Sequence, residues 1–233
     1  MRVAIMQPYF FPYLGYYQLI QSCDVFVLYD DVKYTKKGWI SRNRIQQNGR
    51  VVNVSLQLKN DRDDCLIGER SLALDFDRAK LFRKVAGAYS GAAFWDESKS
   101  VLNAIIGNKE ENLFGYLNNS IEKLLEFLEI PKTILISSQL IDKSLSGTDR
   151  VIAICKELGA DEYINPIGGV DLYSPNIFKD NGLGLGFISS KLSPYSQSDV
   201  EFIPGLSIID LMVNVGIEEL RHRIKSDFEI ERF

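Results

Sequence analysis

Two short apolar runs that flank a helical segment, all within the first 30 residues, constrain the fold of this chain most strongly. Residues 2–6 (RVAIM) and 24–30 (DVFVLYD) lack the alternation of polar and apolar side chains that a half-exposed strand shows. Residues 13–22 between them have helical character. Strand, helix and strand in so short a stretch predict a βαβ unit, whose strands are parallel and covered on both faces.

Later segments extend this α/β pattern. Asn48-Gly49 lies between two extended runs, which predicts a β-hairpin. Helical patterns at 77–89, 98–106 and 110–128 predict a helical insertion over about residues 75–129. We therefore expect a single α/β domain over residues 1–233, with a parallel, Rossmann-like sheet, the hairpin and the insertion.

The last third of the chain predicts three further strands and three helices. Strands are expected at 133–137, 161–164 and 183–189, and a helix capped by Thr148 is expected to end at Gly159. Ser207 and Asp210 have the spacing of a capping box at the start of another helix, and a final helix is expected over 217–225.

Composition excludes several classes of protein. The net charge is −4, so a broad basic surface for duplex nucleic acid is not expected. The three cysteines, Cys23, Cys65 and Cys155, are too far apart for a disulfide framework or a zinc pattern, and reduced packing residues of a cytoplasmic protein are predicted. No stretch approaches the roughly 18 apolar residues of a membrane span, and no metal site or oligomeric state is predicted.

The segment QPYFFPYLGYY, between the first strand and the first helix, concentrates aromatic rings and prolines. Ligands of parallel sheets bind beyond the carboxyl ends of the strands, and a helix N-terminus there offers free N–H groups to an anion. The rings form either a rigid pocket above such a helix end or packing between helix and sheet. The pocket interpretation selects Gln7, Pro8, Tyr9, Phe10, Tyr13, Gly15 and Tyr16.

A basic segment follows the second predicted strand, with cations at positions 33, 36, 37, 42 and 44 around Trp39. Lys36, Arg42 and Arg44 suit phosphate or carboxylate groups, and an indole beside cations suits stacking against a ring or a sugar. A solvated basic loop is the alternative. Asn43 lies within this segment and can donate to a developing oxyanion.

Asp30 and Asp31 end the second predicted strand. Carboxylates there can bind a metal ion, accept a proton from an amine or bind a ribose hydroxyl, whereas turn or cap residues are the alternative. The sequence leaves open which of the two faces a pocket. The single histidine, His222, is expected on the surface of the last helix.

Two later loops add candidates with weaker signals. Asn165 and Gly168 follow a short predicted strand, and glycine there permits a backbone to approach a ligand. Ser189 ends the next predicted strand, and Ser190, Lys191, Tyr195 and Gln197 follow it. The alternative for each is an ordinary turn.

Three segments, QPYFFPYLGYYQLI, DVFVLYDDVKYTKKGWISRNRI and FIPGLSIIDLMVNVG, resemble the signature segments of the WbqC-like family. That family is associated with bacterial surface-polysaccharide gene clusters, such as those for O-antigen and lipopolysaccharide. The resemblance implies a cytoplasmic protein that attaches glycine or a similar acyl group to an amino sugar.

The order of the predicted strands and helices also resembles that of the nucleotidylyltransferase class of ATP-binding folds. Tyr13-Leu14-Gly15-Tyr16 stands where that class has HxGH, and Ile188-Ser189-Ser190-Lys191 stands where its ISSTxxR motif lies. Tyrosines replace both histidines, so hydrogen bonding to phosphate is retained and positive charge is lost. No GxSxG, GxGxxG or Walker A pattern is present.

These observations support three hypotheses. In the first, the protein is an acyltransferase or ATP-dependent amide ligase that joins a small carboxylic or amino acid to a nucleotide-linked amino sugar, with ATP and Mg²⁺ as cofactors. Asp30 or Asp31 would accept the proton of the amine, and Asn43 or a lysine such as Lys36 would stabilise the oxyanion. In the second, it is a non-catalytic module that binds a nucleotide-sugar or a glycosyltransferase. The third hypothesis is a nucleotidyltransferase.

Overall fold

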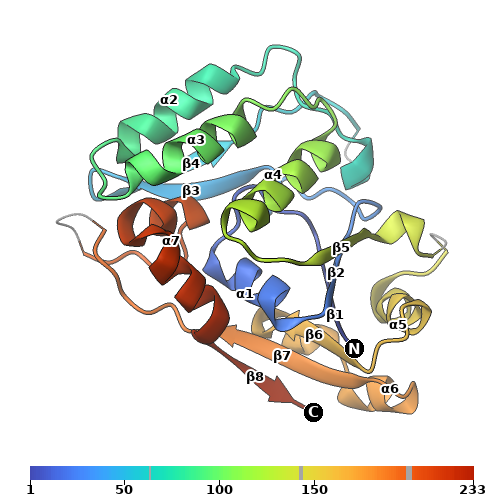
Figure 1. The fold of residues 1–233 in the computed structure, drawn as a ribbon. Helices are drawn as coiled ribbons and strands as arrows, with labels where there is room; N and C mark the ends of the chain where they lie inside the picture. The colour runs from blue at the N-terminus through green and yellow to red at the C-terminus, as the bar shows by residue number, and fades with distance from the viewer. Residues whose placement is uncertain (63, 142–143, 198–200) are drawn as a thin grey trace.

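The computed structural model describes residues 1–62, 64–141, 144–197 and 201–233. At its centre lies a six-stranded sheet of order β5-β2-β1-β6-β7-β8 (Figure 1). Neighbouring strands are parallel, except that β8 is antiparallel to β7. The strands are β1 (Arg2–Met6), β2 (Val25–Leu28), β5 (Thr133–Ile136), β6 (Glu162–Pro166), β7 (Gly184–Ser190) and β8 (Phe228–Arg232). The predicted βαβ unit and the Rossmann-like α/β class are confirmed.

The strand order fixes where a ligand is expected. Counted along the chain, the six strands lie in the order 3-2-1-4-5-6, which is that of a Rossmann sheet. The order reverses between β1 and β6, and the loops after these two strands diverge there. Ligands of such sheets bind in the crevice at this topological switch point.

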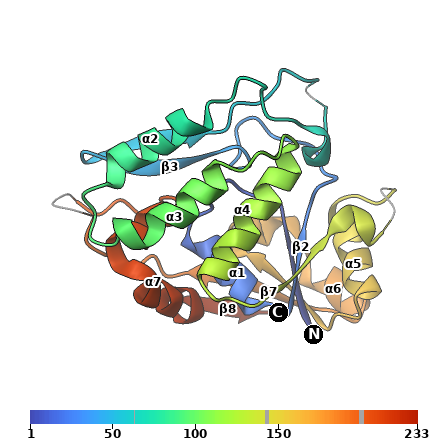
Figure 2. The same ribbon diagram turned by 45° about the horizontal axis from the view of Figure 1, so that its top comes forward.

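Helices cover both faces of the sheet (Figure 2). Alternate residues of β1 point to opposite faces: Ala4 joins the buried cluster under α1, α4 and α7, whereas Val3 and Ile5 join the cluster under α5 and α6. The helices are α1 (Leu14–Ser22), α2 (Arg78–Tyr89), α3 (Trp95–Ile106), α4 (Leu113–Phe127), α5 (Gly147–Glu157), α6 (Pro175–Asp180) and α7 (Ile208–Ser226). Three 3₁₀ helices, η1 (Ile67–Glu69), η2 (Ser137–Gln139) and η3 (Ile167–Leu172), complete the fold.

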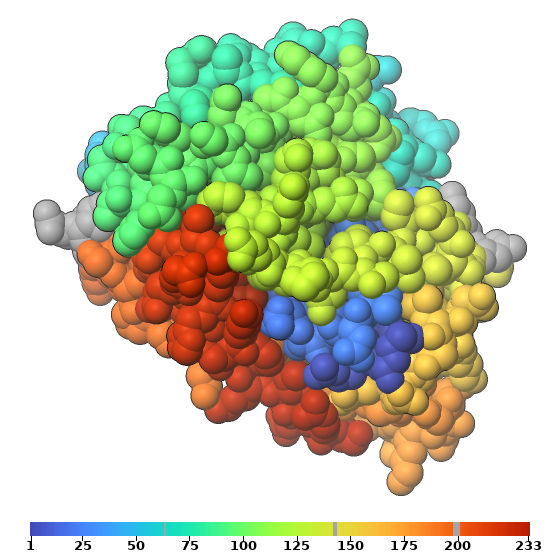
Figure 3. Space-filling view, in the orientation of Figure 1, coloured from blue at the N-terminus to red at the C-terminus, as the bar shows by residue number. Residues whose placement is uncertain are grey.

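The predicted hairpin is a separate two-stranded sheet of β3 (Arg42–Gln47) and β4 (Arg50–Ser55). Asn48 and Gly49 have φ of 52° and 73°, as a tight hairpin turn of the type favoured by Asn-Gly requires. The hairpin lies beneath α2 and α3 in Figure 1. The helices of the predicted insertion share one buried cluster with α1 and α7, and Figure 3 shows α3 and α4 beside α7.

Four details of the C-terminal third differ from the sequence prediction. The short α6 and β8 were not predicted. The division predicted between a helix from Ser207 and a helix over 217–225 is confirmed, because α7 consists of two helical parts that meet at Gly216, where φ is 78° and the backbone is not helical. Ser146, not Thr148, occupies the N-cap position of α5, without a hydrogen bond from its side chain to the helix. Ser207 caps α7 by accepting from the Ile209 N–H, but its own N–H donates to Arg44, so Asp210 does not complete a capping box.

Within the described part of the chain, no helix combines the length and the apolar character that crossing a membrane requires.

Candidate functional site

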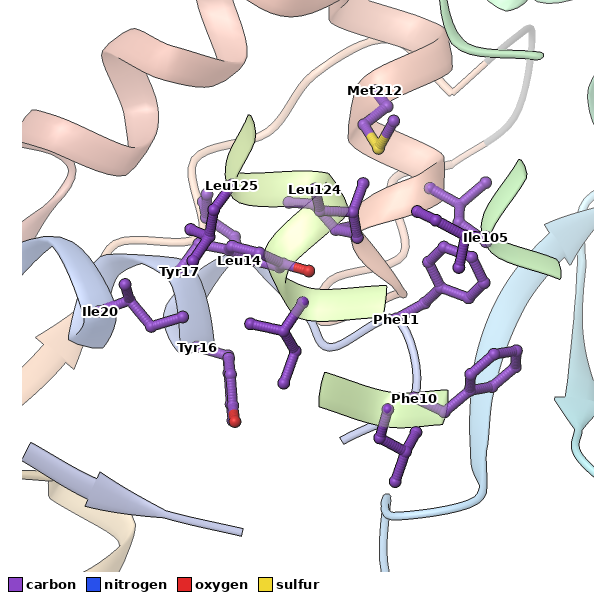
Figure 4. Packing of buried hydrophobic residues seen from close by; sticks show 14 of the residues in the cluster. Phe10, Phe11, Leu14, Tyr16, Tyr17, Ile20, Ile105, Leu124, Leu125 and Met212 are labelled. Carbon is purple, nitrogen blue, oxygen red and sulfur yellow. The ribbon is translucent and has the colours of Figure 1, made fainter. Parts of the chain in front are cut away.

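The aromatic rings of the loop after β1 divide into two groups. Phe10 and Phe11 are buried and pack against residues of α3, α4 and α7 (Figure 4). Tyr16 is buried as well, and its hydroxyl donates to the carbonyl of Gln7 at 3.0 Å. Tyr9 and Tyr13 are only half-buried and line cavities. Core packing is thus the role of Phe10 and Tyr16, and cavity lining is the role of Tyr9 and Tyr13.

The backbone of this loop is held by the hairpin and by α7. Asn43 donates to the carbonyls of Phe10 and Phe11 at 3.0 and 2.8 Å, and its side-chain oxygen accepts from the Arg44 N–H. Ser207 donates to the Phe11 carbonyl at 2.9 Å. Phe11 has a φ of 42°, a conformation uncommon for a bulky residue, which these bonds stabilise. Asn43, which was predicted to donate to an oxyanion, instead holds the backbone of this loop in place.

One cavity lies between this loop and the basic segment, and we call it the Arg44 cavity. It measures about 290 Å³ and is lined by Tyr9, Pro12, Tyr13, Trp39, Asn43, Arg44 and Gly205. The Arg44 guanidinium lies 5.1 Å from the centre of the Trp39 ring and donates to the Gly205 carbonyl at 3.3 Å. Its Nε is buried and has no hydrogen-bond acceptor among the described residues.

A second cavity, the switch-point crevice, lies between the ends of β1 and β6. It measures about 390 Å³ and is lined by Ile5, Met6, Gln7, Tyr9, Tyr29, Val32, Asn165, Pro166, Gly168, Gly169, Leu172 and Tyr173. This lining is aromatic and uncharged. Tyr9 lines both cavities, so they adjoin at its side chain.

The start of α1 meets the end of β7 at Gly15. A Cβ on Gly15 would lie 2.3 Å from Ser190 Oγ and 2.5 Å from the Tyr13 ring, so only glycine fits there. Burial raises the pKa of Tyr13, and a hydrogen bond with Ser190 opposes that rise. The two segments that resemble nucleotidylyltransferase motifs thus lie together. Ser189 is exposed, and Lys191 pairs with Glu229 at the surface.

Asp30 and Asp31 lie at the ends of β2 and β5, where they bind other protein groups. Asp30 accepts from Ser137 Oγ, Ser138 N and Ser138 Oγ at 3.0, 3.0 and 2.6 Å. Asp31 accepts from Ser137 and forms an ion pair with Arg150, and both side chains of the pair are at most 5% exposed. Neither aspartate lines the two cavities. Among the described residues, no group of three acidic, histidine or cysteine side chains could hold a metal ion.

The five cations of the basic segment do not share one environment. Lys33, Lys36 and Lys37 are exposed. Arg42 donates to the carbonyls of Gly38 and Lys37 at 3.2 and 2.6 Å, which fixes the bend before β3. Of these cations, only Arg44 lines a cavity.

The matched residues of a family model include almost all of both cavity linings. The model of the WbqC-like protein family matches residues 7–222. The chain belongs to the WbqC-like family. It is also 28% identical over 221 residues to "Uncharacterized protein Rv1507c" of Mycobacterium tuberculosis, a match that covers 93% of this chain and 95% of the relative. No solved structure matches at a significant level.

Sequence reasoning missed the polar centre of this WbqC-like protein. Asp210 is fully buried and accepts from Tyr89 Oη at 2.6 Å, Tyr195 Oη at 2.7 Å and Gln197 Nε2 at 3.0 Å. Tyr89 Oη in turn accepts from the Gln46 N–H of β3. Asp210 thus connects the hairpin, α2 and the loop after β7, and Tyr195 and Gln197 serve this network instead of lining either named cavity.

The sequence signal for this centre was Asp210, which stands among apolar residues in SIIDLM, whereas Tyr195 and Gln197 lie in a polar stretch. Burial, followed by the Asp210 charge, raises the pKa of both Tyr89 and Tyr195, so both hydroxyls stay protonated and donate to the carboxylate.

Proposed function

We propose that this WbqC-like protein is a cytoplasmic N-acyltransferase of surface-polysaccharide biosynthesis. It would form an amide between a small carboxylic acid and the amine of a nucleotide-linked amino sugar. The observation that carries the proposal is the pair of adjoining cavities, one aromatic and uncharged and one with an arginine, that meet at Tyr9 beside the switch point of the sheet.

The switch-point crevice suits the sugar-bearing substrate. Aromatic faces such as those of Tyr29 and Tyr173 stack on sugar and base rings, and phenol and amide groups bind their hydroxyls. Burial raises the pKa of Tyr9, with a smaller contribution from Tyr13, so its hydroxyl stays protonated at neutral pH and can donate. Gly168 leaves room for a ligand beside the backbone, whereas the Asn165 side chain fills the space beside Gly169.

The Arg44 cavity suits an anionic group, because a guanidinium donates paired hydrogen bonds to carboxylate or phosphate. With one substrate in each cavity, the reacting groups meet beside Tyr9, where the two cavities adjoin. Holding two reactants in contact and in orientation accelerates their reaction strongly. The Tyr9 ring, which lines both cavities, also limits the access of water to an activated acyl group.

In the reaction, the amine nitrogen attacks the acyl carbon. A C–N bond forms, the bond to the leaving group breaks, and the proton of the amine passes to solvent. The leaving group is AMP if ATP activates the acid, or the free carrier if an acyl carrier supplies it. No aspartate, glutamate or histidine appears in the described lining of either cavity, so Arg44 is the group best placed to stabilise the oxyanion.

A protein-bound Mg²⁺ does not fit the residues first considered for it. The oxygens of Asp30 accept hydrogen bonds from two serines, and Asp31 pairs with Arg150. We therefore assign no step to a metal, and ATP enters the assay as one of two alternative sources of activated acid.

The test is amide formation from a dTDP-linked 4-amino-4,6-dideoxysugar, measured by mass spectrometry. One set of reactions contains ATP with glycine or acetate, and the other contains acetyl thioester or aminoacyl-tRNA. We expect one set to give product, and we expect Arg44→Gln and Tyr9→Ala to reduce the rate at least tenfold while the exposed-lysine control Lys37→Gln does not. Absence of product with every donor and several amino sugars would refute the enzyme proposal.

The uncharged lining of the crevice also favours a second candidate, a non-catalytic module that binds a nucleotide-sugar. Calorimetry distinguishes the two, because the module binds the nucleotide-sugar without turnover and co-purifies with a glycosyltransferase. The nucleotidyltransferase hypothesis gains no such support, since Tyr16 of the HxGH-like segment is buried in the core. Pyrophosphate release without amide formation would favour it.

A further inference from the structure

We infer that the Arg44 cavity binds the carboxylate of the acyl substrate and discriminates against phosphate. This inference rests on the proposed function, because it assigns the acid to one of the two cavities. The observations that carry it are the fixed position of the Arg44 guanidinium at the cavity and the charge of the cavity lining.

The guanidinium is held before any ligand arrives. Trp39 stacks on it at 5.1 Å, and the Gly205 carbonyl accepts from Nη2. The backbone of Arg44 is fixed as well, because its N–H donates to Asn43 Oδ1 and its carbonyl accepts from Ser207 N. A planar donor held in this way binds a planar acceptor with two oxygens, which is the shape of a carboxylate.

One donor of this guanidinium lacks a partner. Arg44 Nε is buried and has no acceptor among the described residues, although buried polar groups are almost always hydrogen-bonded. This atom has almost no accessible surface, so a ligand in the cavity does not reach it. A carboxylate therefore binds through the terminal nitrogens of the guanidinium, of which Nη2 already donates one hydrogen to the Gly205 carbonyl.

Charge decides between carboxylate and phosphate. Arg44 is the one charged side chain in the described lining of its cavity, so the lining carries a single positive charge. A carboxylate carries one negative charge, whereas a phosphate monoester carries about −1.5 to −2 at neutral pH. The carboxylate is neutralised on binding, but the phosphate would leave excess negative charge in a partly desolvated site.

The other polar groups of the lining do not supply a second anion-binding site. The amide of Asn43 donates to two loop carbonyls, and the Tyr13 ring lies beside Gly15, as Ser190 Oγ does. Tyr9 is the remaining phenol of the lining, and it lies where the Arg44 cavity meets the crevice. Its hydroxyl is therefore placed between the acid and the sugar-bearing substrate.

The experiment uses the intrinsic fluorescence of the protein. The chain has two tryptophans, and Trp39 is 39% exposed beside Arg44 whereas Trp95 is 9% exposed and belongs to the core cluster. Acetate, glycine, inorganic phosphate and pyrophosphate are titrated into the full chain at constant ionic strength. We expect a saturable change with acetate or glycine, at least tenfold weaker binding of both phosphates, and loss of the signal in Trp39→Phe.

Variants separate shape from charge. Arg44→Lys keeps the positive charge but removes the planar donor, so we expect at least tenfold weaker carboxylate binding, whereas Arg50→Lys on the exposed start of β4 should bind like the unmodified chain. Circular dichroism verifies that each variant is folded. If Arg44→Lys loses its fold, isothermal calorimetry on Trp39→Phe and the unmodified chain still ranks acetate against phosphate.

Two results would overturn the inference: phosphate that binds as tightly as acetate, or an Arg44→Lys variant that binds acetate normally. These measurements need no nucleotide-sugar and no turnover. Carboxylate binding without any amide product would therefore contradict the proposed enzyme and leave the carboxylate site standing.

Discussion

The hydroxyl of Tyr195 donates a 2.7 Å hydrogen bond to the carboxylate of Asp210, which is fully buried. A buried carboxylate is costly unless donors surround it, and here Tyr89 and Gln197 complete the set. The loop after β7, the hairpin and the start of α7 therefore depend on one charged residue for their relative positions. Gly205, which binds Arg44, belongs to the loop that this network holds.

Asp210→Asn should destabilise the protein by on the order of 2–3 kcal/mol, because the amide would place a donor against hydroxyl and amide donors. Urea unfolding monitored by circular dichroism measures this change. The exposed Glu218→Gln on the same helix serves as the control and should change stability by less than about 0.5 kcal/mol. Equal stability of the two variants would show that Asp210 does not hold these elements together.

Gly15→Ala should destabilise the fold, because the new methyl group would overlap Ser190 Oγ and the Tyr13 ring. Gly87→Ala is the matched control: nothing lies within 4 Å of a Cβ there, and Gly87 occupies an exposed position inside α2. Alanine should stabilise that helix by up to about 1 kcal/mol. Thermal melting of the two variants should therefore shift in opposite directions, and a normal melting temperature for Gly15→Ala would contradict the packing described here.

Asp31→Asn distinguishes a structural role from a catalytic one. Removing one partner of this buried ion pair should cost about 3–5 kcal/mol. Asp24→Asn breaks an exposed pair with Arg2 and should cost less than about 1 kcal/mol. A catalytic base would show the reverse pattern, with normal unfolding and lost turnover.

Alkaline pH should weaken the fold through the buried thiols. Burial raises the pKa of Cys155 from 9.0 to about 12, so the unfolded chain releases this proton first as the pH rises. Its contribution is therefore intact below pH 9 and is lost towards pH 12, at up to about 1.4 kcal/mol per pH unit. Unfolding free energies at intervals from pH 8 to about pH 10 should fall less steeply for Cys155→Ala than for the unmodified chain. Parallel slopes would argue against this thiol as the cause.

Local patterns identified the elements whose signals lie within a few residues. Asn48-Gly49 specified its hairpin because the turn needs two positive φ angles, and the run 2–6 specified a strand buried on both faces. The elements α6 and β8 were not predicted because their six and five residues are too few to show a helical or strand pattern of apolar side chains. In addition, β8 is defined by its pairing with β7. A strand that forms only by pairing with another segment shows little pattern in its own sequence.

The candidate site was harder to predict because side-chain direction depends on tertiary contacts. Tyr9 and Phe10 are adjacent aromatics, yet one lines both cavities and the other is core. Their separation follows from a backbone turn at Phe11 that Asn43 and Ser207 hold from distant segments. Arg42 and Arg44 likewise lie two residues apart on one strand, but Arg42 donates to neighbouring carbonyls and only Arg44 lines a cavity.

The hairpin forms a sheet of its own. Arg44, which would bind the acid, therefore belongs to a different sheet from β1 and β6, whose ends form the crevice. Substitutions on β3 can therefore alter the preference for the acid while the crevice for the sugar-bearing substrate stays unchanged. Among relatives, selectivity for the donor and for the acceptor is free to diverge separately, and exchanging the segment around β3 and β4 between two of them should transfer the first without the second.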